Sequence, residues 1–257
     1  HRDLHSFPTL RSSDLAITLA LRNKLAADHP SVTSVDISSF RAKLRAYQRT
    51  SGAFSWLMDS RSTASYYLTL RVLAMLGELQ EADALEPQLS SIKENAVRFI
   101  DKEVVRREKA YRKAHHDSLP DYSVFASYAY VRAMFKEHPI FDDAQRIYSA
   151  ALDSLYAHLN TAELTSWPMM ALTFERAGQH DRALSLINGL RRYATIDHDH
   201  GMYWNNLPDR YWWYRQADLQ ASFLLAFSRI DPQTQELEGL RQWLILNNLT
   251  TDWGQIA

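Results

Sequence analysis

Apolar residues recur with helical spacing along almost the whole chain from residue 15 onward. Phe40, Leu44 and Tyr47 follow one another at i, i+4 and i+7, which places them on one face of a helix. Short breaks such as 50–52 and 230–232 separate the periodic stretches. This pattern predicts an all-α fold of about ten helices, mostly about 14–20 residues long, without paired strands.

Turn residues and capping residues set the expected helix boundaries. The expected helices cover residues 15–29, 36–47, 59–79, 84–115 (as one helix or two), 119–135, 142–158, 161–177, 181–194, 214–228 and 235–247. The stretch 101–113 is dense in mixed charge, so we interpret it as a solvated face. Short connections fit either a right-handed αα-solenoid or an α/α toroid, in which helix pairs close into a ring. No repeat of about 34 residues recurs, which argues against a regular tetratricopeptide array.

Composition argues against several classes of function. The formal net charge is −1, which argues against nucleic acid or an anionic membrane surface as the partner. The chain has no cysteine, so disulfides, thiolate metal sites and a cysteine nucleophile are excluded within it. Glycine is scarce, at 7 residues, which disfavours Gly-rich nucleotide-binding folds. No run of 18 apolar residues is present, so we expect no membrane-spanning helix.

Both ends of the chain have the character of cut ends. Residues 1–14 lack an initiator methionine, a signal-peptide layout and any helical or strand periodicity. This segment resembles a translated sequencing-adapter read-through more than a natural protein segment, and the alternative is a disordered leader. Residues 251–257 contain a Trp-Gly pair that resembles the start of another element. We therefore expect an internal fragment, with residues 15–257 forming a partial helical domain.

Two clusters of histidine and aspartate are candidate metal sites. In Asp197-His198-Asp199-His200, both imidazoles would share one face of an extended segment and could reach one divalent ion. A third ligand is not identifiable nearby, and such runs between helices are usually solvated loops. His115-His116-Asp117 lies where a charged helix ends, and histidines there interact favourably with the helix dipole. We assign no metal ligands.

Carboxylates and aromatic residues near the expected helix ends are the candidates for glycosidase chemistry. An α/α-toroid glycosidase needs two facing carboxylates, and its candidates here are Asp59, Asp121, Asp209 and Asp218. Each is equally explained as a helix cap or first-turn residue. The aromatic candidates for stacking on a sugar are Tyr203, Trp204, Tyr211, Trp212, Trp213 and Tyr214. Because crowded aromatic side chains more often pack or form interfaces, we assign no catalytic or cofactor-binding residue.

Several short motifs, in order along the chain, carry a family resemblance. They are Gly52-Ala53-Phe54-Ser55-Trp56 with Ser60-Arg61-Ser62, the helix-turn pattern of 172–183, Gly201-Met202-Tyr203-Trp204, and the segments 217–227, 241–247 and 251–254. The chain resembles the α/α-toroid region of bacterial alpha-2-macroglobulin family proteins, a thioester-domain-like and terpenoid cyclase-like ring of helices. It departs from the family at Ser62, where a tyrosine is frequent, and at Asp218-Leu219, where the family has Glu-Thr.

The resemblance implies a non-catalytic domain of a steric protease trap, with endopeptidase inhibitor activity, in the bacterial envelope. The location would be periplasmic or membrane-anchored, and the partners would be proteases, met through the full-length protein, and neighbouring domains. Some members carry a Cys-x-Glu-Gln thioester motif, and none of that chemistry carries over to a chain without cysteine. The matching tryptophans Trp56, Trp204 and Trp243 are interpreted as packing residues. Two alternatives remain open: an α/α-toroid carbohydrate-active enzyme and a helical-repeat protein-binding scaffold.

Overall fold

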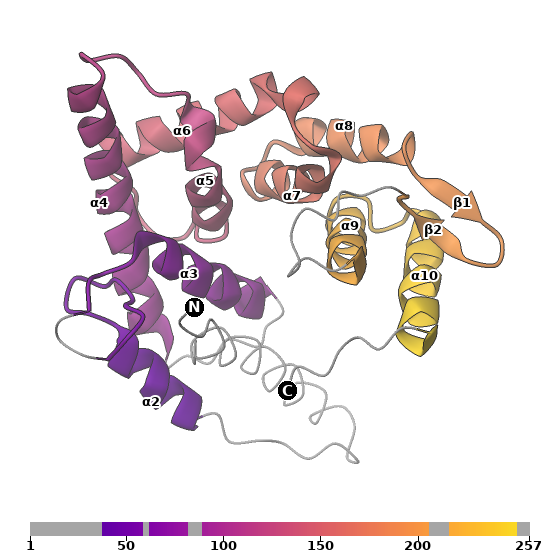
Figure 1. The fold of residues 1–257 in the computed structure, drawn as a ribbon, viewed down its shortest axis with the longest axis horizontal. Coiled ribbons are helices and arrows are strands. Elements are labelled where there is room, and N and C mark those ends of the chain that lie inside the picture. Colours follow the sequence, from indigo (N-terminus) through magenta and orange to yellow (C-terminus); the bar gives the residue numbers. More distant parts are fainter. Residues whose placement is uncertain (1–37, 59–61, 82–88, 206–215, 251–257) are drawn as a thin grey trace, which may run out of the picture. The chain divides into compact units, whose positions relative to one another are not determined.

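The computed structural model describes residues 38–58, 62–81, 89–205 and 216–250. The described residues are mostly helical (Figure 1), as the sequence predicts for an all-α fold. The chain divides into two compact units, residues 1–151 and 152–257, and each is described by itself. No helix in the described ranges is both long and apolar enough to cross a membrane.

The first unit is built around a long helix that packs against two shorter ones. Helix α4 (Ser90–Ala114) contacts α3 (Tyr66–Glu81) and α5 (Ala126–Ala133), which follows the 3₁₀ turn η3 (Tyr122–Phe125). The unit also contains α2 (Ser38–Tyr47) and the beginning of α6 (Asp142–Ala157). Its core is apolar, and its fully buried members include Leu73, Leu76, Ile92, Ile100 and Phe135. This burial holds together helices that are individually only about two to seven turns long.

The loop 48–65 joins α2 to α3 and is tightly packed. Phe54 is fully buried and pairs with Gln48 and Ser65 through isolated β-bridges, while its backbone N–H donates to Thr69 Oγ1 at 2.9 Å. Gly52 has φ +91°, and a Cβ there would lie 2.1 Å from the Asn95 carbonyl oxygen of α4. The loop is therefore extended at Phe54 and held against both α3 and α4. Helix α3, by contrast, begins only at Tyr66, because Ser65 still belongs to this bridge pattern.

The second unit contains two pairs of consecutive helices. The end of α6 leads through η4 (Leu159–Thr161) and η5 (Leu164–Ser166) to α7 (Trp167–Arg176), which packs on α8 (His180–Arg191). Helix α9 (Gln216–Ile230) contacts α7, α8 and α10 (Glu236–Thr250). Gly178, at φ +78°, ends α7 in the position that glycine favours. The continuous helix predicted over 161–177 is wrong in its first turns, which are the separate 3₁₀ turns.

One short β-hairpin interrupts the helices. Strand β1 (Thr195–Asp197) pairs antiparallel with β2 (Gly201–Tyr203), with Ile196 opposite Met202, and β2 lies against α10 (Figure 1). The prediction that no strands pair is thus wrong at this place. Strands of three residues are too short to leave a readable alternation in the sequence.

Candidate functional site

The hairpin turn holds the histidine-aspartate cluster that the sequence singles out. Asp197 Oδ1 accepts from the backbone N–H groups of Asp199 and His200 at 2.9 and 2.8 Å, and His200 Nδ1 lies 2.8 Å from the same oxygen. His198 Nδ1 instead lies 3.0 Å from Asp199 Oδ1. The extended conformation considered from the sequence is therefore not found, and the two rings have different carboxylate partners. Hydrogen bonds from the His200 side chain and backbone hold the pKa of Asp197 below its usual value.

Metal ligation needs several such groups to converge on one point. Over the described ranges, no group of three or more histidine, cysteine, aspartate or glutamate side chains is placed to hold a metal ion. Asp197 is already engaged by the turn that it closes. The cluster is built as a turn motif, in which one carboxylate organises the backbone after it.

Two glycines allow the hairpin to lie directly on α10. Gly201 has φ +81°, and a Cβ there would come within 2.2 Å of the Gly239 carbonyl oxygen. A Cβ on Gly239 would in turn lie 3.1 Å from the backbone nitrogen of Met202. Gln242 of α10 adds two hydrogen bonds, from Nε2 to the carbonyl oxygens of His198 and Asp199 at 3.2 and 3.1 Å. The turn is therefore held on α10 by the close backbone approach at Gly201 and by the hydrogen bonds from Gln242.

A hollow of about 320 Å³ lies between this hairpin and the start of α10. It is lined by Ile196, Asp197, His198, Gly201, Met202, Gln235, Glu236, Gly239 and Gln242. Ile196 at its rim is 74% exposed, whereas Met202, opposite it in the hairpin, is 2% exposed. Two carboxylates line the hollow, and each is engaged by its own neighbours: Asp197 accepts from the backbone of the turn, and Glu236 accepts from Arg191.

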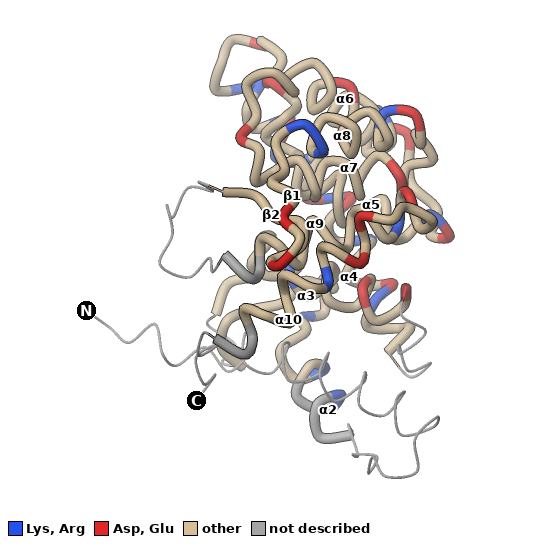
Figure 2. The backbone as a smooth tube through the Cα atoms, turned by 90° about the vertical axis from the view of Figure 1, so that its right-hand side faces the viewer, with Lys and Arg blue, Asp and Glu red and all other residues tan. Residues whose placement is uncertain are grey.

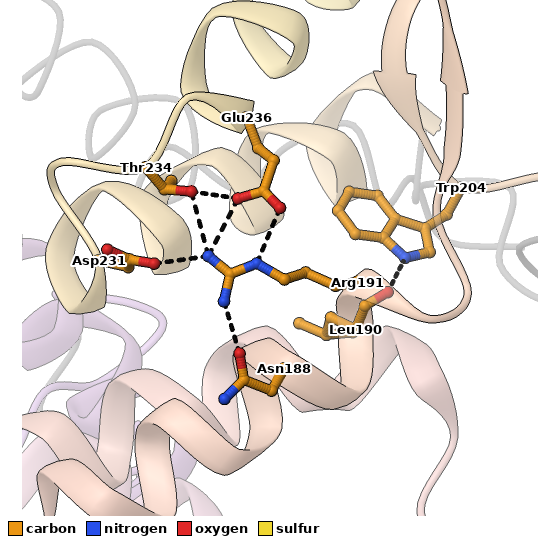
Figure 3. Close-up of polar contacts among 7 residues, drawn as sticks. All are labelled: Asn188, Leu190, Arg191, Trp204, Asp231, Thr234 and Glu236. Carbon is orange, nitrogen blue, oxygen red and sulfur yellow. Dashed lines mark hydrogen bonds and ion pairs between the residues drawn. The ribbon is translucent and has the colours of Figure 1, made fainter.

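Next to the hollow, Arg191 ties the end of α8 to the turn between α9 and α10 (Figure 3). Its guanidinium donates to Glu236 at 2.9 and 3.0 Å, to Asp231 at 2.5 Å and to Thr234 at 3.1 Å. Its remaining amino group donates to Asn188 Oδ1 at 2.6 Å. Burial opposes ionisation of Glu236, but the hydrogen bonds from Arg191 and Thr234 prevail and hold its pKa below the ordinary value. All three nitrogens of the Arg191 guanidinium therefore have partners within the cluster, which is typical of a structural clamp.

Two tryptophans of the resemblance motifs, Trp204 and Trp243, are packing residues in this structure. Trp204 is fully buried, stacks on Phe223 with ring centroids 3.9 Å apart, and donates from Nε1 to the Leu190 carbonyl oxygen at 3.0 Å (Figure 3). Trp243 is 7% exposed and stacks on Tyr203. Neither indole face is open to a sugar. Trp56 is half-buried, and Tyr211, Trp212, Trp213 and Tyr214 lie outside the described residues.

The candidate carboxylates and the second histidine cluster have local roles where they are described. Asp121 caps η3, because its side chain accepts from the Ser123 backbone N–H at 2.9 Å. Asp59, Asp209 and the side chain of Asp218 lie outside the described residues. At the end of α4, His115 Nδ1 lies 2.8 Å from the Tyr111 carbonyl oxygen, and the imidazole stacks on the Tyr111 ring. His116 and Asp117 follow in left-handed conformations, at φ 52° and 62°.

The interpretation of 101–113 as a solvated face is wrong on one side of α4. Asp101 and Glu108 are each 1% exposed. Tyr128 donates to Asp101 Oδ1 at 2.7 Å, and Arg132 Nε lies 3.2 Å from that oxygen. Burial raises the pKa of Asp101, against the opposing effects of Tyr128 and Arg132.

Glu108 makes a second buried contact, about two helical turns further along α4. Arg146 of α6 donates to both of its carboxylate oxygens, at 2.8 and 2.5 Å, and these bonds hold the pKa of Glu108 below its usual range. Tyr122 donates to the same carboxylate at 2.5 Å. A sequence signal for both acids exists in their spacing. Val97, Asp101, Val104 and Glu108 follow one another at helical intervals, so the acids continue an apolar stripe.

Comparison with known proteins does not add a function to this geometry. No protein-family model matches the chain, and no curated protein matches it significantly.

Proposed function

We propose that this chain is a non-catalytic helical domain of an alpha-2-macroglobulin-like protease trap of the bacterial envelope, with the architecture of an incomplete α/α toroid. In this proposal the parent protein inhibits endopeptidases sterically. The domain contributes by packing on neighbouring domains and by shifting when a distant bait region is cleaved. Its cellular location, periplasmic or membrane-anchored, and its protease partners belong to the same proposal.

The observation that carries the proposal is the construction of the two resemblance loops. In the loop 52–56, Gly52 touches α4 and Phe54 is fully buried. In the loop 201–204, Gly201 touches α10 and Trp204 is fully buried. Both loops therefore position helices, as motifs of a structural domain do. Reactive side chains at these places would instead have to face an open cavity.

The pairing of consecutive helices supports the toroid. Helices α7 and α8 contact one another, and so do α9 and α10, while α7 also contacts α9. Such helix pairs packed side by side are the repeating unit of rings and solenoids. The clamp of Arg191 on Asp231 and Glu236 fixes one pair against the next.

A carbohydrate-active enzyme is less well supported. Asp121 is committed to capping η3, and Trp204 is committed to the core of the second unit. The enzyme alternative needs two carboxylates about 5–10 Å apart beside an open aromatic platform. Release of reducing sugar from bacterial polysaccharides by the purified chain would favour it over the trap.

The proposal is tested with the full-length protein that carries this chain. A protease is incubated with it and then assayed on a large protein substrate and on a small chromogenic peptide. A steric trap lowers activity on the large substrate and spares activity on the peptide. If activity on the large substrate is the same before and after incubation, the proposal is overturned.

A further inference from the structure

Helix α4 carries a row of basic residues along one exposed side. Asp101 and Glu108 point into the protein, where Arg132 and Arg146 contact them. A separate, exposed side carries five cations at successive helical intervals of four, four, three and four residues, namely Arg98, Lys102, Arg106, Lys109 and Lys113. We call these five residues the α4 stripe. At 3.6 residues per turn they lie within about 80° of the helix circumference and extend over about 22 Å.

The α4 stripe is exposed and only partly neutralised. All five side chains are exposed. Arg106 pairs with Glu103, and Lys109 lies 3.7 Å from Asp143. Arg98, Lys102 and Lys113 form no ion pair with another described residue. Basic and acidic positions are otherwise interspersed along the described chain (Figure 2).

A row of like charges is unfavourable unless something compensates for it. Like charges at i, i+4 destabilise a helix. Here the inward acids do not relieve the row, because each is already paired with an arginine of another element. A negatively charged partner laid along α4 would compensate for the repulsion.

The chemistry of the stripe selects among anionic partners. The stripe contains no aromatic side chain for stacking on bases and no apolar side chain for insertion into a membrane. The chain as a whole has a net charge of −1, so it lacks the broad positive field that steers nucleic acid or anionic lipid surfaces. The class of partner that fits the stripe is therefore one with a short run of negative charge, about as long as the stripe itself.

We infer that the exposed face of α4 docks an acidic segment of another protein, whose carboxylates pair with Arg98, Lys102, Arg106, Lys109 and Lys113. The docking is electrostatic, so its affinity falls steeply as salt is raised. The inference is independent of the proposed function, because the acidic partner need not be a protease.

The test measures binding of a fluorescent 20-residue oligoglutamate peptide to the full chain at low salt. The stripe variant is Arg98→Glu/Lys102→Glu. The matched control is Lys136→Glu/Arg192→Glu, which changes the net charge equally at exposed positions outside the stripe. Circular dichroism verifies that both variants are folded. We expect the stripe variant to bind the peptide about tenfold more weakly than the wild type, and the control within about twofold of it.

Three results would overturn the inference. The wild type could fail to bind oligoglutamate any better than oligoglutamine. The two variants could lose affinity equally, which would mean that net charge alone governs binding. Phosphatidylglycerol vesicles or a 20-nucleotide DNA could also bind through the stripe more tightly than the peptide, which would assign the surface to a lipid or nucleic-acid partner.

Discussion

Gly201 of β2 lies so close to Gly239 of α10 that a Cβ on Gly201 would stand 2.2 Å from the Gly239 carbonyl oxygen. Gly201 belongs to the motif 201–204 of the family resemblance, so this contact gives that motif a role in the packing of the second unit. Position 201 favours glycine for two reasons. Its φ is +81°, which side-chain-bearing residues rarely adopt, and a Cβ there would collide with the backbone of α10.

Substitution of Gly201 by alanine tests this contact. We expect Gly201→Ala to lower the free energy of unfolding by about 2–4 kcal/mol, because the added Cβ is both strained and blocked by backbone. Gly178→Ala is the control, since φ there is +78° but nothing lies within 4 Å of the added Cβ. It should lose only about 1 kcal/mol. Equal losses in urea unfolding would mean that the approach of β2 to α10 is unimportant.

The buried acid of α4 gives a second prediction. Asp101→Ala leaves the Arg132 guanidinium buried without its carboxylate, and should cost about 3–5 kcal/mol of stability. Asp121→Ala removes only a cap at the surface and should cost about 1 kcal/mol. Thermal unfolding of both variants checks the difference. A mild effect of Asp101→Ala would contradict the assignment of Asp101 to a buried pair.

The Arg191 clamp predicts a dependence of stability on pH. Because the folded-state pKa of Glu236 is lowered, its contribution is complete above the unfolded-state pKa of about 4.3 and is lost as pH falls through the folded-state value. Asp231 and Arg191 are the charged groups that face it. Glu236→Gln should therefore lose about 1–2 kcal/mol at pH 7, and its deficit should shrink as pH falls below about 4.3.

The control for this pH profile is Glu238→Gln, whose side chain is 84% exposed and lies 3.5 Å from Arg241. It should follow the wild type at every pH, since exposed pairs contribute little. A constant deficit of Glu236→Gln across pH 3–7 would show that packing, not ionisation, explains its effect.

Replacement of Trp204 separates packing from ligand binding. Trp204→Ala should lose about 3–5 kcal/mol, because the indole is fully buried between helices. Tyr193→Ala, whose ring is 63% exposed, should lose less than about 1 kcal/mol. A stable Trp204→Ala variant with weakened binding to oligosaccharides would instead favour a sugar platform.

The sequence predicts most helices, because a long helix repeats its apolar spacing, but the predicted bounds are too wide for α5 and α7, each of which follows a 3₁₀ turn. It misses the hairpin, because three residues per strand give no period and the pairing partner is set by the contact with α10. The charged half of α4 is misread for a related reason. Mixed charge indicates a solvated helix only when both signs face water, and the partners of Asp101 and Glu108 lie on α5 and α6, 31 and 38 residues further along the chain.

The turn at 197–200 shows the limit for candidate sites. Its residue types suit a metal, but its function in the fold depends on backbone conformation. Once Gly201 adopts a positive φ, Asp197 caps the turn and its oxygen is occupied by backbone N–H groups. Composition alone could not distinguish these outcomes.

The most direct test of the central claim compares protease activity on a large protein substrate with activity on a small peptide after incubation with the full-length protein. We expect the ratio of the two activities to fall several-fold with the wild type, to stay near that of free protease with Trp204→Ala, and to fall again with Tyr193→Ala. An unchanged ratio with the wild-type protein would contradict the account.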